Sequence, residues 1–360
     1  MRGLADVPAS AAASLGVPGF TDTLDLGVAQ HAVIVLIDGL GWNSLQAHRD
    51  IAPCLTSGQH TSTEISTVFP STTPAGLGTL GTALLPGAHG MVGASFWLPE
   101  ADEILTPLHW NDGVTPVAVQ PESTVFERAA QHGIEVTTVA PGADSDSGLT
   151  RAVLRGGDDQ AADSLAARVE HTHRLTRSTA RSLTYVYWPD LDRTGHAKGV
   201  GSDEWKSDLR QVDRLVAQIA ESLPSNAVAL VTADHGMVNC DERVSIDDDP
   251  ALSSGIVRIA GEPRMRHVYV REGSVSDVVE SWRHRLMGKV DIRTRDELID
   301  SGLLGEVELD IAERIGDFVA ISRGTTSLTS SFDPRVSGLI GQHGALTEDE
   351  MRIPAIVMRG

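Results

Sequence analysis

Three apolar runs, each followed by acidic residues, constrain the fold of this chain most strongly. Residues 32–37, 182–188 and 227–233 are rich in β-branched and aromatic side chains and show little polar alternation. Such runs are typical of strands buried on both faces, in a parallel sheet covered by helices. Ligands bind at the carboxyl edge of open α/β sheets. Asp38 and Asp234 directly follow two of these runs, so we expect both at that edge.

A second informative stretch is residues 68–76, which place hydroxyl groups before a proline. Proline is tolerated at the first helical position, and this predicts a helix that starts at Pro74 with Thr73 as its N-cap. The free amides and the positive end of the helix dipole then form an anion site beside the hydroxyl. Thr73 is therefore interpreted as a cap or as a nucleophile, and Thr72 competes for the second role.

Acids and imidazoles that follow strands or lie in glycine-flanked loops form a candidate metal centre. Asp/His ligation without a thiolate suits zinc, or a harder ion such as manganese. Two ions about 4 Å apart can clamp the attacking and leaving oxygens of a displacement at phosphorus. A threonine oxygen beside such an ion loses its proton more easily. Asp190 is a rival to Asp192, and the remaining candidates are Asp38, His196, Asp234, His235 and His343.

Composition narrows the class of partner. The net charge of −20 disfavours binding to long nucleic acid, whereas a small phosphate ester or nucleotide remains a plausible substrate if a metal supplies positive charge. The two cysteines, Cys54 and Cys240, form no CxxC motif. We identify no signal peptide and no stretch that could span a membrane, so we expect a cytoplasmic protein. The oligomeric state stays open.

Domain organisation is predicted from a shift in composition. We expect an α/β core that carries the candidate metal centre, formed by residues 1–253 and 308–360, and a small cap-like α+β insertion at 254–307. The apolar run at 317–322 is assigned to the core as a returning strand. A final strand is expected at 353–358, with Pro354 near an edge or near the strand's beginning.

Taken in order, the motifs resemble the type I phosphodiesterase/nucleotide pyrophosphatase branch of the alkaline phosphatase superfamily. The resemblance implies a three-layer sandwich with a mostly parallel sheet. It also implies one zinc held by Asp38, Asp234 and His235 near Thr73, and a second held by the remaining three ligands. The motifs are Ile37-Asp38-Gly39, Phe69-Pro70-Ser71-Thr72-Thr73, Pro86-Gly87-Ala88-His89-Gly90, Asp192-x-x-x-His196, Thr232-Ala233-Asp234-His235-Gly236 and Gly341-Gln342-His343-Gly344.

The resemblance implies that the threonine forms a covalent phospho-enzyme, which water then resolves. One departure concerns position 76, where we expect an asparagine that binds a phosphate oxygen and find Gly76. A backbone amide, Thr79 or Asn43 is a possible substitute. His89 is predicted to fix the loop after the helix. Trp97, Trp110 and Trp188 could stack against a base or a leaving group, but tryptophans in such positions are more often packing residues.

Three functions remain in consideration. The first is a di-zinc phosphodiesterase or nucleotide pyrophosphatase that acts through Thr73. The second is a related phosphonoacetate hydrolase that cleaves a C–P bond with the same metals. The third is a non-catalytic, metal-stabilised binding protein, which Gly76 favours.

Overall fold

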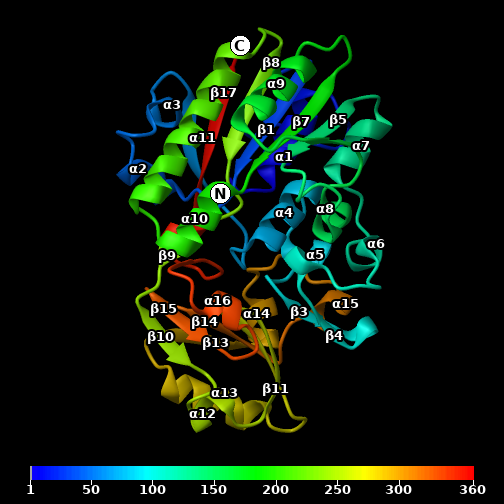
Figure 1. Cartoon of the computed structure of the whole chain (residues 1–360). Helices are drawn as coiled ribbons and strands as arrows, with labels where there is room; N and C mark the ends of the chain where they lie inside the picture. The colour runs from blue at the N-terminus through cyan, green and yellow to red at the C-terminus, as the bar shows by residue number, and fades with distance from the viewer. Residues whose placement is uncertain (1) are drawn as a thin grey trace.

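The computed structural model describes residues 2–360, and its main feature is a seven-stranded sheet (Figure 1). Strand β17 runs antiparallel to both of its neighbours, and the pairs among β8, β1, β7, β5 and β6 are parallel. The prediction of a mostly parallel sheet is therefore confirmed. In spatial order the strands are β2 (Thr61–Ser66), β17 (Arg352–Arg359), β8 (Ala227–Thr232), β1 (His31–Ile37), β7 (Ser182–Trp188), β5 (Glu135–Ala140) and β6 (Asp158–Ala161).

Helices cover both faces of this sheet and complete the three-layer sandwich (Figure 1). Helices α9 (Leu165–Leu175) and α11 (Asp203–Ser222) pack together on one face, and α9 contacts β7. Helix α1 (Asp6–Ser14) contacts β1 on the other face and packs against α4 (Thr73–Thr82) and α7 (Val125–Gln131), and α7 contacts β5.

The local sequence explains these elements. All seven residues of β1 are buried, as expected for a central strand with helices on both sides. Helix α11 begins after Ser202, whose hydroxyl accepts from the amide of Trp205. Its buried residues recur every three or four positions and form one apolar stripe against the sheet.

A smaller antiparallel sheet lies below the core in Figure 1 and has its own apolar cluster. The predicted strand at 317–322 exists as β14, but it joins this smaller sheet, where it pairs with β12 and β13. The assignment to the core was wrong because an apolar run does not specify its pairing partner. The sheet therefore extends past residue 307. Its strands are β11 (Ile256–Glu262), β12 (Met265–Val270), β14 (Phe318–Ser322) and β13 (Val290–Thr294).

Shorter strand pairs and the remaining helices complete the fold. The two-stranded pairs are β3 (Phe96–Leu98) with β4 (Glu103–Leu105), β9 (Val238–Asn239) with β16 (Gly341–Gln342), and β10 (Glu242–Ser245) with β15 (Thr326–Thr329). The remaining α-helices are α2 (Trp42–Ala47), α3 (Pro53–Thr56), α5 (Pro86–His89), α6 (Pro116–Val119), α8 (Gly148–Val153), α10 (Asp190–Lys198), α12 (Pro250–Ser253), α13 (Val275–Arg285), α14 (Arg295–Asp300), α15 (Leu309–Ala312), α16 (Pro334–Ser337) and α17 (Glu348–Met351).

A fully buried ion pair joins the small sheet to the core. Arg264, in the turn between β11 and β12, donates to both carboxylate oxygens of Glu350 in α17, at 3.1 and 2.8 Å. Both side chains are completely excluded from solvent. The carboxylate of Glu350 also accepts from the amide of Ala345, so the pair holds the loop that follows β16.

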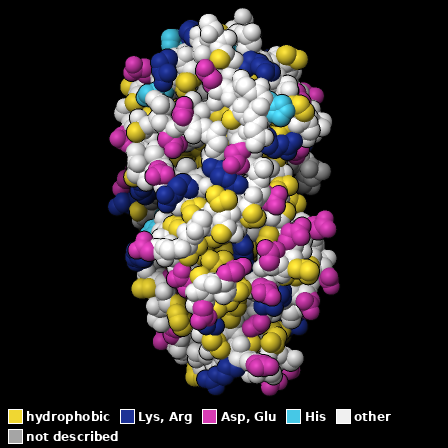
Figure 2. All heavy atoms as spheres, turned by 90° about the vertical axis from the view of Figure 1, so that its right-hand side faces the viewer, with side chains coloured by type: hydrophobic (Ala, Val, Ile, Leu, Met, Phe, Trp, Pro, Cys, Tyr) yellow, Lys and Arg dark blue, Asp and Glu magenta, His cyan; other side chains and the backbone are white. Residues whose placement is uncertain are grey.

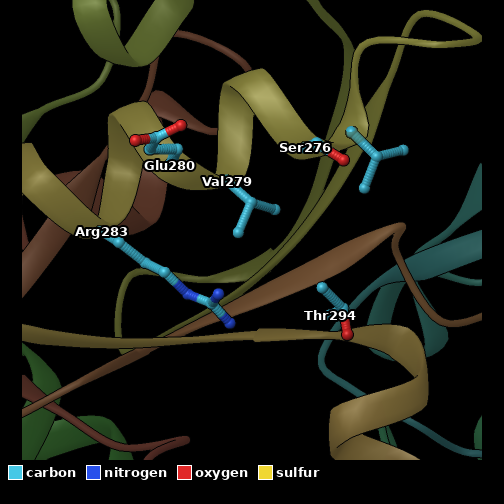
Figure 3. A pocket seen from close by; sticks show the side chains of 6 residues that line it. Ser276, Val279, Glu280, Arg283 and Thr294 are labelled. Atoms are coloured by element: carbon cyan, nitrogen blue, oxygen red, sulfur yellow. The ribbon is translucent and has the colours of Figure 1, made fainter.

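The surface shows no segregation of charge on the face seen in Figure 2. Acidic and basic side chains are interspersed there, and hydrophobic side chains gather at mid-height. A pocket of about 360 Å³ lies between α13 and β13 of the small sheet (Figure 3), where Val279 and Arg283 line it opposite Thr294. Its lining includes none of the predicted metal ligands. Within residues 2–360 no helix is both long and apolar enough to cross a membrane.

Candidate metal centre and nucleophile

The six predicted ligands converge at the carboxyl edge of the central sheet. Asp38 follows β1, and Asp234 with His235 follow β8. Asp192 and His196 lie one helical turn apart in α10, which begins two residues after β7. His343 directly follows the short strand β16. The strand order brings β1, β7 and β8 together, so side chains far apart in the sequence meet here.

One group consists of Asp192, His196 and His343. The Nε2 atoms of the two imidazoles lie 3.2 Å apart. Oδ2 of Asp192 lies 3.3 Å from His196 Nε2, and its Oδ1 lies 3.8 Å from His343 Nε2. The ligand atoms are close enough together to share one cation.

The second group surrounds His235. Its Nε2 lies 3.5 Å from a carboxylate oxygen of Asp38, 3.5 Å from one of Asp234, and 3.1 Å from the hydroxyl oxygen of Thr73. The rings of His235 and His343 stack with centroids 3.7 Å apart, so the two groups adjoin. Asp192 also lies within reach of the Asp38–His235 pair, which places it between the groups.

The imidazole tautomers suit metal binding. Each Nδ1 lies 2.7–2.9 Å from a backbone carbonyl oxygen, which can only accept. Each Nδ1 therefore donates its proton to that carbonyl, which leaves Nε2 as the nitrogen available to a metal. The carbonyls facing His196, His235 and His343 belong, in that order, to Gly341, Gly236 and Ser71.

The carboxylate oxygens of the cluster also suit metal binding. Asp38 Oδ1, Asp192 Oδ1 and Asp234 Oδ2 are buried and have no hydrogen-bond partner within the described residues. Burial, followed by the charges of Asp234 and Asp192, raises the pKa of Asp38 well above its ordinary value. Burial also lowers the pKa of His343, and the other two histidines lower it further. Bare oxygens and lone pairs in this arrangement fit divalent cations, which stabilise the charged carboxylates and neutral imidazoles.

The N-cap of α4 differs from the sequence prediction. Thr72 is the cap: it has extended backbone angles, and its hydroxyl accepts from the amide of Ala75. Thr73 is the first residue of the helix and is 5% exposed. Capping by Thr72 leaves the hydroxyl of Thr73 free to point at His235, which favours Thr73 over its neighbour as a nucleophile.

Gly76 lies where α4 passes closest to Asp234. A Cβ atom at position 76 would meet the Cβ of Asp234 at 2.7 Å and its carbonyl oxygen at 3.0 Å. An asparagine therefore does not fit without moving the helix. The amide of Gly76 donates to the carbonyl of Thr72.

The other expected substitutes also have partners. Thr79 contacts His89 at 3.1 Å, and Asn43 donates to Asp349 at 2.8 Å. A role in substrate binding for Gly76 or Asn43 stays a prediction.

His89 and Asp190 take structural roles. His89 is fully buried, and its Nδ1 accepts from the amide of Met91, so it fixes the turn after α5 as predicted. Burial lowers the pKa of His89 to about 3, so this ring is neutral. Asp190 pairs with Arg193 at 2.8 Å and belongs to neither ligand group.

The three tryptophans also have packing partners. The guanidinium of Arg258 lies 3.8 Å from the ring centroid of Trp97, and that of Arg168 lies 4.5 Å from Trp188. Trp110 donates to the carbonyl of Val114.

Three supporting residues were missed by the sequence analysis. Tyr187 donates to Asp38, and Ser71 binds the His343 loop through its carbonyl and hydroxyl groups. Glu262 reaches His343 from the small sheet, and burial and the charge of Glu350 raise its pKa well above its ordinary value. Ser71 lies within a recognised motif, but neither Tyr187 nor Glu262 has a local sequence signal.

Solved structures with the same fold include two kinds of hydrolase. Murine ectonucleotide pyrophosphatase/phosphodiesterase 5 superimposes with a TM-score of 0.74 and 18% identity, covering 90% of this chain and 87% of that one. Phosphonoacetate hydrolase from Sinorhizobium meliloti, solved with phosphonoacetate, gives a TM-score of 0.70 and 19% identity, covering 91% and 89%.

Sequence comparison identifies relatives over shorter segments. Human ectonucleotide pyrophosphatase/phosphodiesterase family member 7 is 38% identical over 66 residues, which are 17% of this chain and 14% of the relative. Human family member 5 is 24% identical over 108 residues, or 29% of this chain and 23% of the relative. The family described as type I phosphodiesterase/nucleotide pyrophosphatase matches residues 32–346. The chain therefore belongs to the type I phosphodiesterase/nucleotide pyrophosphatase family.

Proposed function

We propose that the protein is a two-metal phosphodiesterase or nucleotide pyrophosphatase with Thr73 as its nucleophile. The observation that carries this proposal is the Thr73 hydroxyl, 3.1 Å from His235 Nε2, at the edge of a cluster of bare carboxylate oxygens and imidazole lone pairs. Family membership supports the reaction class. The murine relative was also solved as an inactive threonine-to-alanine variant in complex with AMP, which supports a small nucleotide substrate.

In this proposal Asp38, Asp234 and His235 hold one ion, and Asp192, His196 and His343 hold the other. The donor set favours zinc, with manganese second. When bound, the ions supply positive charge that lowers the pKa of the Thr73 hydroxyl and stabilises the oxygens on phosphorus.

The residues of the chain orient the reaction. The start of α4 fixes Thr73 in the first helical turn, where backbone N–H groups and the helix dipole favour a phosphate. The Thr73 oxygen would form a bond to phosphorus as its proton passes to water, and the bond to the leaving alcohol or nucleotide would break as the leaving oxygen takes up a proton from water. The resulting threonine ester keeps the second substituent on phosphorus. A water molecule would then displace Thr73, which regains its proton, and release a phosphate monoester.

The experiment measures hydrolysis of an aryl phosphodiester and a dinucleoside polyphosphate by zinc- or manganese-loaded protein. We expect metal-dependent turnover that Thr73→Ala abolishes, together with trapping of a phosphorylated threonine in the wild type. Full turnover by a folded Thr73→Ala variant would contradict the proposal.

Phosphonoacetate hydrolysis is the second candidate, and the fold similarity to the bacterial enzyme supports it. Release of phosphate from phosphonoacetate, without hydrolysis of either ester, would favour this reaction. Bound metal without turnover of any of these substrates would indicate a binding protein.

A further inference from the structure

A carboxylate from the small sheet lies against the metal centre. Glu262 is the last residue of β11 and is only 8% exposed. Its Oε2 lies 3.5 Å from Nδ1 of His343, whereas Nε2 of that ring faces the ligand cluster. Its Oε1 has no hydrogen-bond partner within residues 2–360.

No lysine or arginine among the described residues pairs with this carboxylate. Arg266, two strand positions beyond the turn, favours the negative charge, but its guanidinium donates to the carbonyl of Leu328 and to Asp333. The carboxylate of Glu262 therefore lies in a buried place with the His343 ring as its only close basic partner among the described side chains. Burying an unpaired carboxylate is costly, so its position requires a compensating interaction.

The backbone of the His343 loop leaves room for Glu262. Gly344 adopts a φ of +124°, and a Cβ atom at this position would lie 2.6 Å from Glu262 Oε1. The amide of Gly344 donates to the hydroxyl of Ser71 at 3.0 Å, so the loop is fixed in this conformation. A glycine at 344 therefore permits the carboxylate to approach the ring.

We propose that Glu262 is a positioning residue, which orients His343 and strengthens it as a metal ligand from the Nδ1 side. This inference rests on the proposed function, in which His343 Nε2 binds a metal. The carbonyl of Ser71 accepts the Nδ1 proton at 2.9 Å, and the carboxylate adds negative charge on the same side. Carboxylates behind imidazole ligands fix the ring orientation and raise its basicity. The small sheet thus contributes directly to the metal centre.

The test compares Glu262→Gln, which keeps the shape and removes the charge, with Glu242→Gln as a matched control. Glu242 lies in the same part of the molecule but pairs with Lys289 and Thr326, away from the histidines. Competition with a chromophoric chelator measures the zinc affinity of each purified protein. We expect Glu262→Gln to lower the affinity for one of two bound zinc ions by about 10- to 100-fold. The Glu242→Gln control should bind both ions with wild-type affinity.

Two further measurements separate positioning from general structural damage. In metal-free protein, the ¹⁵N and ¹H shifts of the His343 Nδ1–H group should change in Glu262→Gln and not in Glu242→Gln. The thermal midpoint of metal-free Glu262→Gln should equal or exceed that of the wild type, because a neutral amide replaces a buried carboxyl group whose ionised form is unfavourable there. Glu262→Asp, which keeps the charge at greater distance, should bind zinc with intermediate affinity.

Unchanged zinc affinity and unchanged His343 shifts in a folded Glu262→Gln variant would overturn the inference. An equal loss of affinity in Glu242→Gln would overturn it as well. A wild-type protein that binds no ions would instead contradict the proposed function, so the two failures are distinguishable.

Discussion

Two neighbouring threonines at the start of α4 have different roles. Thr72 caps the helix, whereas the hydroxyl of Thr73 faces His235. Thr72→Ala should therefore lower the free energy of unfolding by about 1 kcal/mol while metal-dependent turnover persists. Thr72→Ser should restore stability. Urea unfolding and aryl phosphodiester turnover measure the two effects, and loss of turnover in Thr72→Ala with normal stability would assign the nucleophile to Thr72.

Gly76 is a second single-residue test. Gly76→Ala places a methyl group against Asp234, and neither the backbone nor the Cβ there can move away easily. We expect a loss of about 1–3 kcal/mol in the free energy of unfolding, together with weaker zinc binding as Asp234 is displaced. Gly58→Ala is the control, since a Cβ at that position meets nothing within 4 Å. Equal stability of the two variants would show that α4 tolerates a side chain at 76.

His267 predicts how stability depends on pH. Its Nε2 donates to the carbonyl of Val92, and its Nδ1 accepts from the amide of Gly316. Burial lowers the pKa of His267 to about 4, below its ordinary value of 6.5. The unfolded chain therefore binds the proton more readily, and the stabilising contribution is complete above pH 6.5 and lost as the pH falls toward 4. At pH 5 this loss is about 2 kcal/mol.

The corresponding measurement is urea unfolding at pH 7.5 and pH 5. His267→Gln should be less stable than the wild type at pH 7.5, and the difference should narrow at pH 5. The exposed His173→Gln serves as the control and should show the same difference from wild type at both pH values. A constant difference for His267→Gln would mean that the buried ring accepts a proton without cost.

At the scale of elements, the sequence predicted the type and position of single helices and strands better than the contacts between them. Strand β1 and helix α11 follow from apolar runs and an i, i+3/i+4 stripe. Helix α4 was expected one residue late, because two adjacent threonines are equally suitable caps by type. Strand β14 was assigned to the wrong sheet, since pairing depends on contacts distant in sequence. Glu262 was missed for the same reason: only the folded turn brings it to His343.

At the scale of the whole molecule, we expect the ligand cluster to couple the free energy of unfolding to metal binding. Without cations, the buried carboxylates at the sheet edge repel one another, and burial raises the pKa of Asp38 and of Asp234 above their ordinary values. A chelator should lower the thermal midpoint, and zinc or manganese should raise it. When the free ion concentration is 100 times the dissociation constant, binding of one ion adds about 2.7 kcal/mol to the free energy of unfolding.

Differential scanning calorimetry with and without chelator gives this measurement. Asp192→Asn removes the carboxylate that lies between the two ligand groups, so it should lose most of the metal-dependent shift. A thermal midpoint that stays the same with chelator and with added zinc would contradict a metal centre at this site.

The buried pair of Arg264 and Glu350 has a consequence for how substrates enter. Moving the small sheet away from the core would break this pair, and removing one partner of a buried pair typically costs about 3–5 kcal/mol. We therefore expect the pair to oppose a hinge motion between the small sheet and the core. A substrate would then reach the ligand cluster without the two parts separating.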